Sequence, residues 1–150
     1  MKILILAIGK MKGELSDALA EYKKRLKLPL EIKEFDIRES NPALLQQKES
    51  AALLKQIPDG AYVVACHGAG KALSSREFAK KLQLLRDKGT KTLVFLIGGA
   101  DGHTAEILKK ADFALSFGTM TWPHRLARLM LMEQLYRAET IMAGSPYHRE

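Results

Sequence analysis

Cysteine is nearly absent from this chain. Among its 150 residues Cys66 is the only cysteine, so an internal disulfide is excluded. No Cys/His cluster with the spacing of a zinc site occurs either, and we expect no metal. A lone thiol is typical of proteins in a reducing compartment, which predicts a cytoplasmic protein in which Cys66 is a small buried apolar residue without thiol chemistry.

Long apolar runs are also missing. The apolar run at the N-terminus, residues 3–8, is far shorter than a membrane span, and no small-residue cleavage site follows it. The hydrophobic fraction of 47% and charged fraction of 27% are those of a soluble globular protein. No repeat or linker interrupts the sequence. We therefore expect one domain, residues 1–150, with no membrane association.

Acidic residues are outnumbered. Seventeen Asp and Glu oppose 24 Lys and Arg, which gives a formal charge of +7. This excess favours a polyanionic partner such as nucleic acid, although many soluble proteins carry a similar charge without one. The candidate RNA-contacting residues are Lys10, Lys12, Lys71, Arg76, Arg125 and Arg128.

Hydrophobic patterning predicts strands that alternate with helices. Strands are expected over residues 2–8, 30–37, 62–66, 91–97 and 113–117, and helices over 14–28, 42–57, 75–88, 105–111 and 124–142. Such alternation is typical of an α/β domain with a mainly parallel sheet and helices on both faces.

Three glycine-rich loops follow predicted strands, at residues 67–71, 98–102 and 118–123. Ligands gather at the carboxyl ends of parallel strands, so the loops predict a site for a nucleotide-like molecule, although glycines also serve tight turns alone. A Walker A loop is disfavoured because Ala65 and Ala72 stand where its first glycine and its hydroxyl are needed. The G-x-G-x-x-G spacing of a dinucleotide site is absent.

The last helix and the tail after it hold the most unusual side chains. The helix is apolar on more than one face, which predicts cover on more than one side, with a second copy of the chain as one candidate. Glu133 and Arg137 are spaced as a surface ion pair. The ending Tyr147-His148-Arg149 supplies a phenol, an imidazole and a guanidinium, although chain ends commonly fray.

Several of these blocks, in this order, resemble the RlmH (YbeA) family of SPOUT-class RNA methyltransferases. They are LIGGADG (96–102), TWPH (121–124), EQLYRA (133–138) and PYHRE (146–150). The resemblance covers essentially the whole chain. It implies a C-terminal trefoil knot, S-adenosyl-L-methionine as cofactor, and a homodimer. It also implies methylation of N3 of a pseudouridine in 23S ribosomal RNA within the assembled 70S ribosome.

The resemblance further implies two groups of site residues. The catalytic candidates are His148, Tyr147, Glu133, Arg137 and Arg149, with His148 favoured as proton acceptor and Glu133 as the alternative. The cofactor-binding candidates are Cys66, His67, Gly98, Gly99, Gly118, Thr119, Met120, Thr121, Trp122 and Pro123.

The other histidines are given lesser roles. His67 is expected to contact the cofactor without chemistry, His124 to be a structural hydrogen-bonding residue, and His103 to be solvated.

Two rival functions remain open. One is a basic α/β module that docks on ribosomal RNA without chemistry, and the other is a small nucleotide- or flavin-binding protein. A docking module has no need of Glu133, Arg137, Tyr147 and His148 together.

Overall fold

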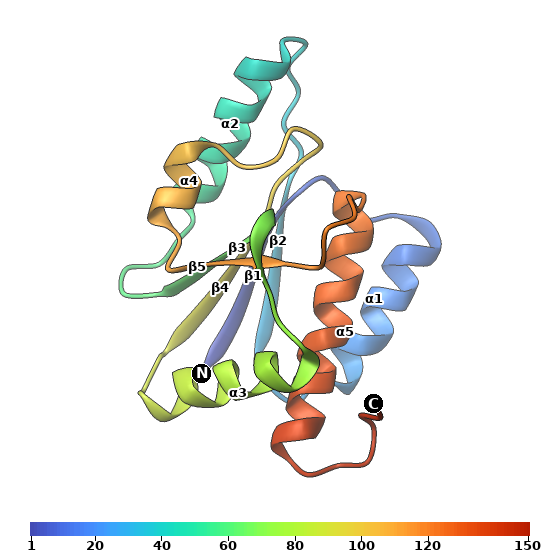
Figure 1. Cartoon of the computed structure of the whole chain (residues 1–150). Coiled ribbons are helices and arrows are strands. Elements are labelled where there is room, and N and C mark those ends of the chain that lie inside the picture. The colour runs from blue at the N-terminus through green and yellow to red at the C-terminus, as the bar shows by residue number, and fades with distance from the viewer.

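The strands form a single parallel sheet. A computed structural model describes residues 1–150 and places five strands in the order β2-β1-β4-β3-β5. The helices α1, α3 and α5 cover one face and α2 and α4 cover the other (Figure 1). The predicted α/β fold class is thus confirmed. The elements are β1 (Lys2–Ile8), α1 (Gly13–Arg25), β2 (Leu30–Phe35), α2 (Pro42–Lys55), β3 (Tyr62–Ala72), α3 (Ser75–Asp87), β4 (Thr92–Ile97), α4 (Ala105–Lys110), β5 (Phe113–Ser116) and α5 (His124–Met142).

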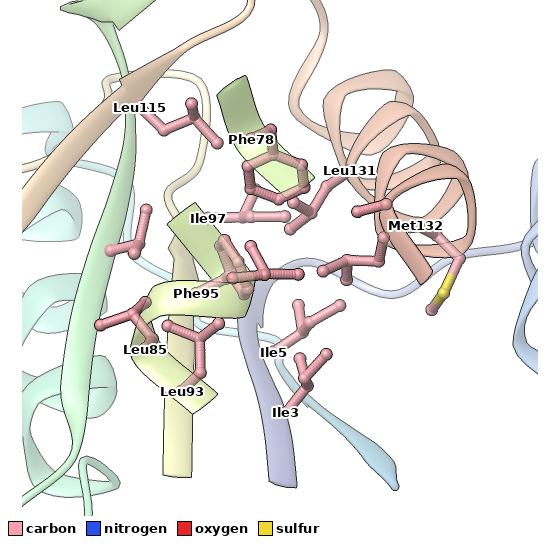
Figure 2. Packing of buried hydrophobic residues seen from close by; sticks show 14 of the residues in the cluster. Ile3, Ile5, Phe78, Leu85, Leu93, Phe95, Ile97, Leu115, Leu131 and Met132 are labelled. Atoms are coloured by element: carbon pink, nitrogen blue, oxygen red, sulfur yellow. The ribbon is translucent and has the colours of Figure 1, made fainter. Parts of the chain in front are cut away.

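The three interior strands of the sheet, β1, β4 and β3, carry the core. Successive side chains of a strand point to opposite faces, so a strand buried on both faces is apolar throughout. In β1, Ile3 and Ile5 contribute to the core under α1, α3 and α5, whereas Leu4 and Leu6 contribute to the core under α2 and α4. Figure 2 shows the first core, in which Ile3, Ile5, Leu93, Phe95 and Ile97 of the sheet face Phe78, Leu131 and Met132 of the helices.

Strand β3 is longer than predicted. Residues 67–71 were expected to form a flexible loop, but β3 continues to Ala72. Cys66 and Lys71 both pair with Leu115 of β5, so the residues between them form a bulge. A Cβ at Gly70 would lie 2.5 Å from the carbonyl oxygen of Ala114. Glycine there permits the close backbone approach that keeps the two strands paired.

Helix starts follow the predicted caps more closely than helix ends follow the predicted stops. Asn41 and Thr104 each accept a backbone N–H from their first helical turn, and Ser74 with Glu77 forms a capping box. By contrast, α1 ends at Arg25, whereas the predicted helix continued to residue 28. Strand β2 likewise ends at Phe35 instead of residue 37.

Helix α5 is covered on two sides by its own chain. It packs against α1 and α3, and its buried apolar residues are Leu131, Met132, Leu135 and Ala138. Glu139 on the same helix accepts hydrogen bonds from the backbone N–H groups of Lys27 and Leu28 at 2.7–3.1 Å. None of the helices combines the length and the apolar character that a membrane span requires.

Candidate active site

A cavity of about 570 Å³ and another of about 510 Å³ meet at the carboxyl end of β5. The smaller, called here the loop cavity, is lined by residues 66–69 of β3, by the end of β4 and the loop after it, by β5 and the loop after it, and by the start of α5. All of the predicted cofactor-binding residues line it except Pro123, which instead precedes the first turn of α5. Those lining it are Cys66, His67, Gly98, Gly99, Gly118, Thr119, Met120, Thr121 and Trp122.

Two glycines of the loop cavity, Gly118 and Gly98, are favoured by its geometry. Gly118 has a φ of +110°, a conformation that residues with a side chain rarely adopt. A Cβ at Gly98 would lie 3.2 Å from both the backbone carbon of Gly102 and the Nδ1 atom of His103. The loop after β4 therefore closes so tightly that a side chain at its first position would have to displace Gly102 and His103 slightly.

His103 is not solvated, so that prediction is wrong. Its ring lines the loop cavity, with Nε2 3.1 Å from the carbonyl oxygen of Leu96. Because a carbonyl only accepts, Nε2 carries the proton and Nδ1 is an unpaired acceptor. Burial lowers the pKa of His103, which keeps the ring neutral.

Ser116, which the sequence analysis did not single out, connects two of the cavity's walls. Its Oγ lies 3.0 Å from the carbonyl oxygen of Gly68 and 2.9 Å from that of Gly118, and it accepts the backbone N–H of Gly118 at 3.1 Å. A polar residue at the buried end of an apolar strand was the available signal. Nearby, burial raises the pKa of the Cys66 thiol to about 12, in agreement with the expectation of no thiol chemistry.

The second cavity, called here the helix cavity, shares Leu115, Phe117 and Gly118 with the first. Its remaining wall is mostly apolar and comes from the end of β3, from Ser116 of β5 and from α1, α3 and α5. Glu133 and Gln134 supply a polar edge, and Ser75 donates a hydrogen bond of 2.7 Å to Gln134. The two cavities are thus neighbours across the end of β5.

Glu133 is the centre of a hydrogen-bond network that orders the tail. Its Oε1 accepts from Arg137 Nε at 2.9 Å, from Arg137 Nη2 at 2.5 Å and from the Tyr147 hydroxyl at 3.1 Å. Its Oε2 accepts from Gln134 at 2.8 Å. Arg137 and Glu133 are only 23% and 18% exposed, so they form a partly buried pair in place of the expected surface pair.

The tail packs on this network, so the alternative of a frayed end is wrong. The Tyr147 ring packs edge-on against Tyr136 at 4.8 Å, and the Arg137 guanidinium lies 4.9 Å from the Tyr147 ring centre. Burial is the main cause that raises the pKa of Tyr147 to about 12, so its hydroxyl remains a donor at neutral pH. Glu150 forms an ion pair with Arg76 of α3, and Arg149 is exposed.

The tautomer of His148 follows from its partner. Arg137 Nη1 lies 3.1 Å from His148 Nδ1, and a guanidinium can only donate. Nδ1 therefore holds the lone pair, and the neutral ring carries its proton on Nε2. That atom is buried without a hydrogen bond, 3.7 Å from the Glu150 carboxylate. Hydrogen bonds thus join four of the five predicted catalytic residues, namely Glu133, Arg137, Tyr147 and His148.

The predicted basic surface is only partly exposed. Arg128 is fully buried, so its assignment to RNA is wrong, and Arg76 is engaged with Glu150. Arg125 is exposed and donates from Nε to the carbonyl oxygen of Lys10 at 2.9 Å, which brings the first turn of α5 beside the β1–α1 loop. His124 lies in the same region and lines the loop cavity, where burial lowers its pKa.

No group of three or more His, Cys, Asp or Glu side chains is arranged to hold a metal ion.

Comparison with known proteins assigns the whole chain to one group. The sequence model of a family described as "Predicted SPOUT methyltransferase" matches residues 1–148. A protein of Paramagnetospirillum magneticum is 45% identical over 153 residues, which cover 99% of each chain. A protein of Caulobacter vibrioides is 46% identical over 159 residues, covering 100% of this chain and 99% of the other. Both relatives are named ribosomal RNA large subunit methyltransferase H.

A solved structure supports the fold independently. A probable methylase family protein from Haemophilus influenzae superposes with a TM-score of 0.57 over 99% of this chain and 70% of that chain, at 14% identity. Similarity at that level of identity concerns the fold alone.

Proposed function

This chain belongs to the SPOUT methyltransferase family, and we propose that it methylates N3 of a pseudouridine in 23S ribosomal RNA, using S-adenosyl-L-methionine. The observation that carries the proposal is that two cavities share a wall at the end of β5, formed by Leu115, Phe117 and Gly118. One is lined by glycine loops, and the other is bordered by Glu133, to which Arg137 and Tyr147 bind.

The loop cavity fits an adenosyl cofactor. Its volume of about 510 Å³ lies within the range of small-molecule sites, and its glycines allow a ring or a ribose to approach the backbone. His103 Nδ1 offers a buried acceptor for a donor of the ligand. When bound, S-adenosyl-L-methionine supplies an electrophilic methyl group on a positively charged sulfur.

The acceptor nitrogen needs help to react. A neutral N3–H is a poor nucleophile, so a base must take its proton as N3 forms a bond to the methyl carbon and the sulfur–carbon bond breaks. Glu133 is an unsuitable base because four hydrogen bonds already reach its two oxygens. We therefore assign proton acceptance to His148.

Arg137 positions that base. The lone pair of neutral His148 is at Nδ1, where Arg137 Nη1 now donates. Proton acceptance requires this one contact to be given up, and Arg137 remains held by its Nε and Nη2 bonds to Glu133. Tyr147 and Arg149 are assigned to the acceptor nucleotide, the first by stacking or hydrogen bonding and the second by binding a phosphate or base edge.

The RNA partner is supported by exposed basic groups in the β1–α1 loop and in the first turn of α5. Lys10, Lys12 and Arg125 are exposed, and Arg125 contacts the Lys10 carbonyl beside the first turn of α5. Such groups bind phosphates without reading sequence. In this proposal these groups bring the catalytic domain itself into contact with the RNA of the assembled 70S ribosome.

The proposal also includes a homodimer and a cytoplasmic site of action, where ribosomes are found. Met120 and Trp122 at the rim of the loop cavity are 73% and 40% exposed, and large exposed apolar side chains favour a contact with another protein surface. The C-terminal trefoil knot that the family resemblance implies is retained as part of this proposal.

Transfer of labelled methyl groups tests the function. The protein is incubated with labelled S-adenosyl-L-methionine in three separate reactions. Each reaction contains one acceptor: 70S ribosomes lacking the modification, free 50S subunits or naked 23S RNA. We expect label at N3 of one pseudouridine, with 70S ribosomes as the best acceptor. Ribosome binding without label on any acceptor would favour the docking module, and a tightly bound coloured cofactor would favour a flavin protein.

A further inference from the structure

A buried carboxyl lies behind the loop that follows β4. Glu49 of α2 is 6% exposed, and its Oε1 atom has no hydrogen-bond partner. Burial of an unpaired carboxyl destabilises a folded protein, so natural structures keep such groups where a ligand or a reaction needs them. The function proposed above gives Glu49 no role.

Glu49 occupies the space that a side chain at position 99 would need. A Cβ on Gly99 would lie 2.7 Å from Glu49 Oε2 and 2.9 Å from Oε1. Gly99 itself lines the loop cavity. Gly99 therefore touches both the cavity and this carboxyl, and the missing side chain of a glycine lets the carboxyl approach the loop closely.

The same face of α2 already holds this loop through another residue. Gln46, one helical turn before Glu49, donates from Nε2 to the Asp101 carbonyl oxygen at 2.9 Å. The loop is thus anchored to α2 by a satisfied hydrogen bond, without help from Glu49. Burial, followed by the nearby Asp101 carboxylate, raises the pKa of Glu49. Both effects are costs to the free protein, and neither is offset by a partner.

We propose that Glu49 is a cofactor-recognition residue whose carboxyl accepts a hydrogen bond from the bound adenosyl cofactor beside Gly99. The inference rests on the methyltransferase function proposed above. An adenosyl cofactor offers two kinds of donor of suitable strength, the ribose hydroxyls and the α-ammonium. Acidic side chains that bind ribose hydroxyls are a recurring feature of nucleotide sites.

Calorimetry and thermal unfolding of the full-length Glu49→Met variant test this role. We expect the affinity for S-adenosylhomocysteine to fall tenfold or more, and the unfolding midpoint of the ligand-free variant to rise. The affinity falls because the ligand loses its hydrogen-bond acceptor. The midpoint rises because the apolar side chain replaces an unpaired buried carboxyl. A merely structural residue would lose stability on substitution. Unchanged affinity, or a lowered midpoint together with weaker binding, would overturn the proposal.

Two analogues identify the donor. Methylthioadenosine lacks the amino acid and its ammonium, and a 2′,3′-dideoxy form of S-adenosylhomocysteine lacks both ribose hydroxyls. A ribose donor predicts that Glu49→Met weakens the binding of methylthioadenosine but leaves the binding of the dideoxy compound unchanged. An ammonium donor predicts the reverse. Equal loss for both compounds would contradict a single hydrogen bond and overturn the assignment.

A double substitution tests the role of Gly99. Gly99→Ala should displace the Glu49 carboxyl and strongly lower the affinity for S-adenosylhomocysteine. In a Glu49→Ala background the same substitution should lower that affinity little further. Additive losses would contradict the contact. Glu106→Met, at an exposed acid of α4, is the matched control and should change neither affinity nor unfolding. If wild type binds the cofactor but methylates nothing, the proposed reaction fails while the role of Glu49 remains tested by the binding data.

Discussion

Arg128 and Glu34 form an ion pair that joins the start of α5 to the ends of β1 and β2. Arg128 Nη1 lies 2.6 Å from Glu34 Oε2, and its Nη2 donates to the carbonyl oxygens of Ile8 and Gly9 at 2.9 and 2.8 Å. The same Glu34 oxygen accepts the Met11 backbone N–H at 2.8 Å. Because α5 also lines the loop cavity, this pair fixes one wall of the cavity to the sheet.

Removing this guanidinium should destabilise the fold. Arg128→Ala removes the charge partner of Glu34 and the donor to two backbone carbonyls, so we expect the free energy of unfolding to fall by about 3–5 kcal/mol. Urea denaturation measures the change. Arg125→Ala, three residues earlier and exposed, is the control and should cost no more than about 0.5 kcal/mol. Similar losses in the free energy of unfolding for both variants would show that the buried ion pair stabilises the fold no more than the exposed Arg125 does.

The sheet was predictable from the sequence because its information is local. Alternation of short apolar runs with capped helices predicts parallel strands, and β1 and β4 are apolar after their first residue because both of their faces are buried. The strand ends then located the loop cavity. The bulge in β3 was not predictable, since the pairing of Cys66 and Lys71 with the same residue depends on a strand distant in sequence.

The wrong predictions for polar residues have a common physical cause. A charged or titratable residue in a sequence is expected at the surface unless its partners are known. The partners of Arg128 come from β1 and β2, and that of His103 is the Leu96 carbonyl on β4. Glu49 gave no sequence signal because its importance depends on Gly99, which lies on a different element.

The network around Glu133 should affect the reaction more than cofactor binding. Arg137→Lys keeps the charge but loses the two-atom contact with Glu133 and the contact with His148. We expect kcat to fall about 100-fold or more for this variant and for His148→Ala, as for loss of a general base or its positioning. Affinity for S-adenosylhomocysteine should stay within twofold. Equal losses in kcat and in cofactor affinity would place the network in cofactor binding instead.

Cys66 should react very slowly with alkylating reagents. Its pKa is raised to about 12 by burial. At pH 8 about one such thiol in ten thousand is ionised, against roughly a quarter of exposed cysteines with a pKa of about 8.5. Iodoacetamide labelling followed by intact-mass measurement should show little modification of the folded protein and rapid modification in denaturant. Rapid labelling of the folded form would show that the thiol is accessible and ionised.

Glu49 should also make the stability of the free protein depend on pH in one direction. Its folded-state pKa is raised, chiefly by burial, above the ordinary value of 4.5. The unfolded chain therefore releases this proton first as pH rises, and the stability present below pH 4.5 is lost progressively up to the folded-state pKa.

Glu49→Gln removes that titration. We expect the free energy of unfolding of the variant, minus that of wild type, to increase with pH across this window and then become constant. Urea denaturation of both proteins at several pH values measures the difference, in which the titrations of other carboxylates cancel. A difference that decreases with pH would mean that the ionised form of Glu49 has a stabilising partner in the free protein, and the carboxyl would no longer be available to a ligand.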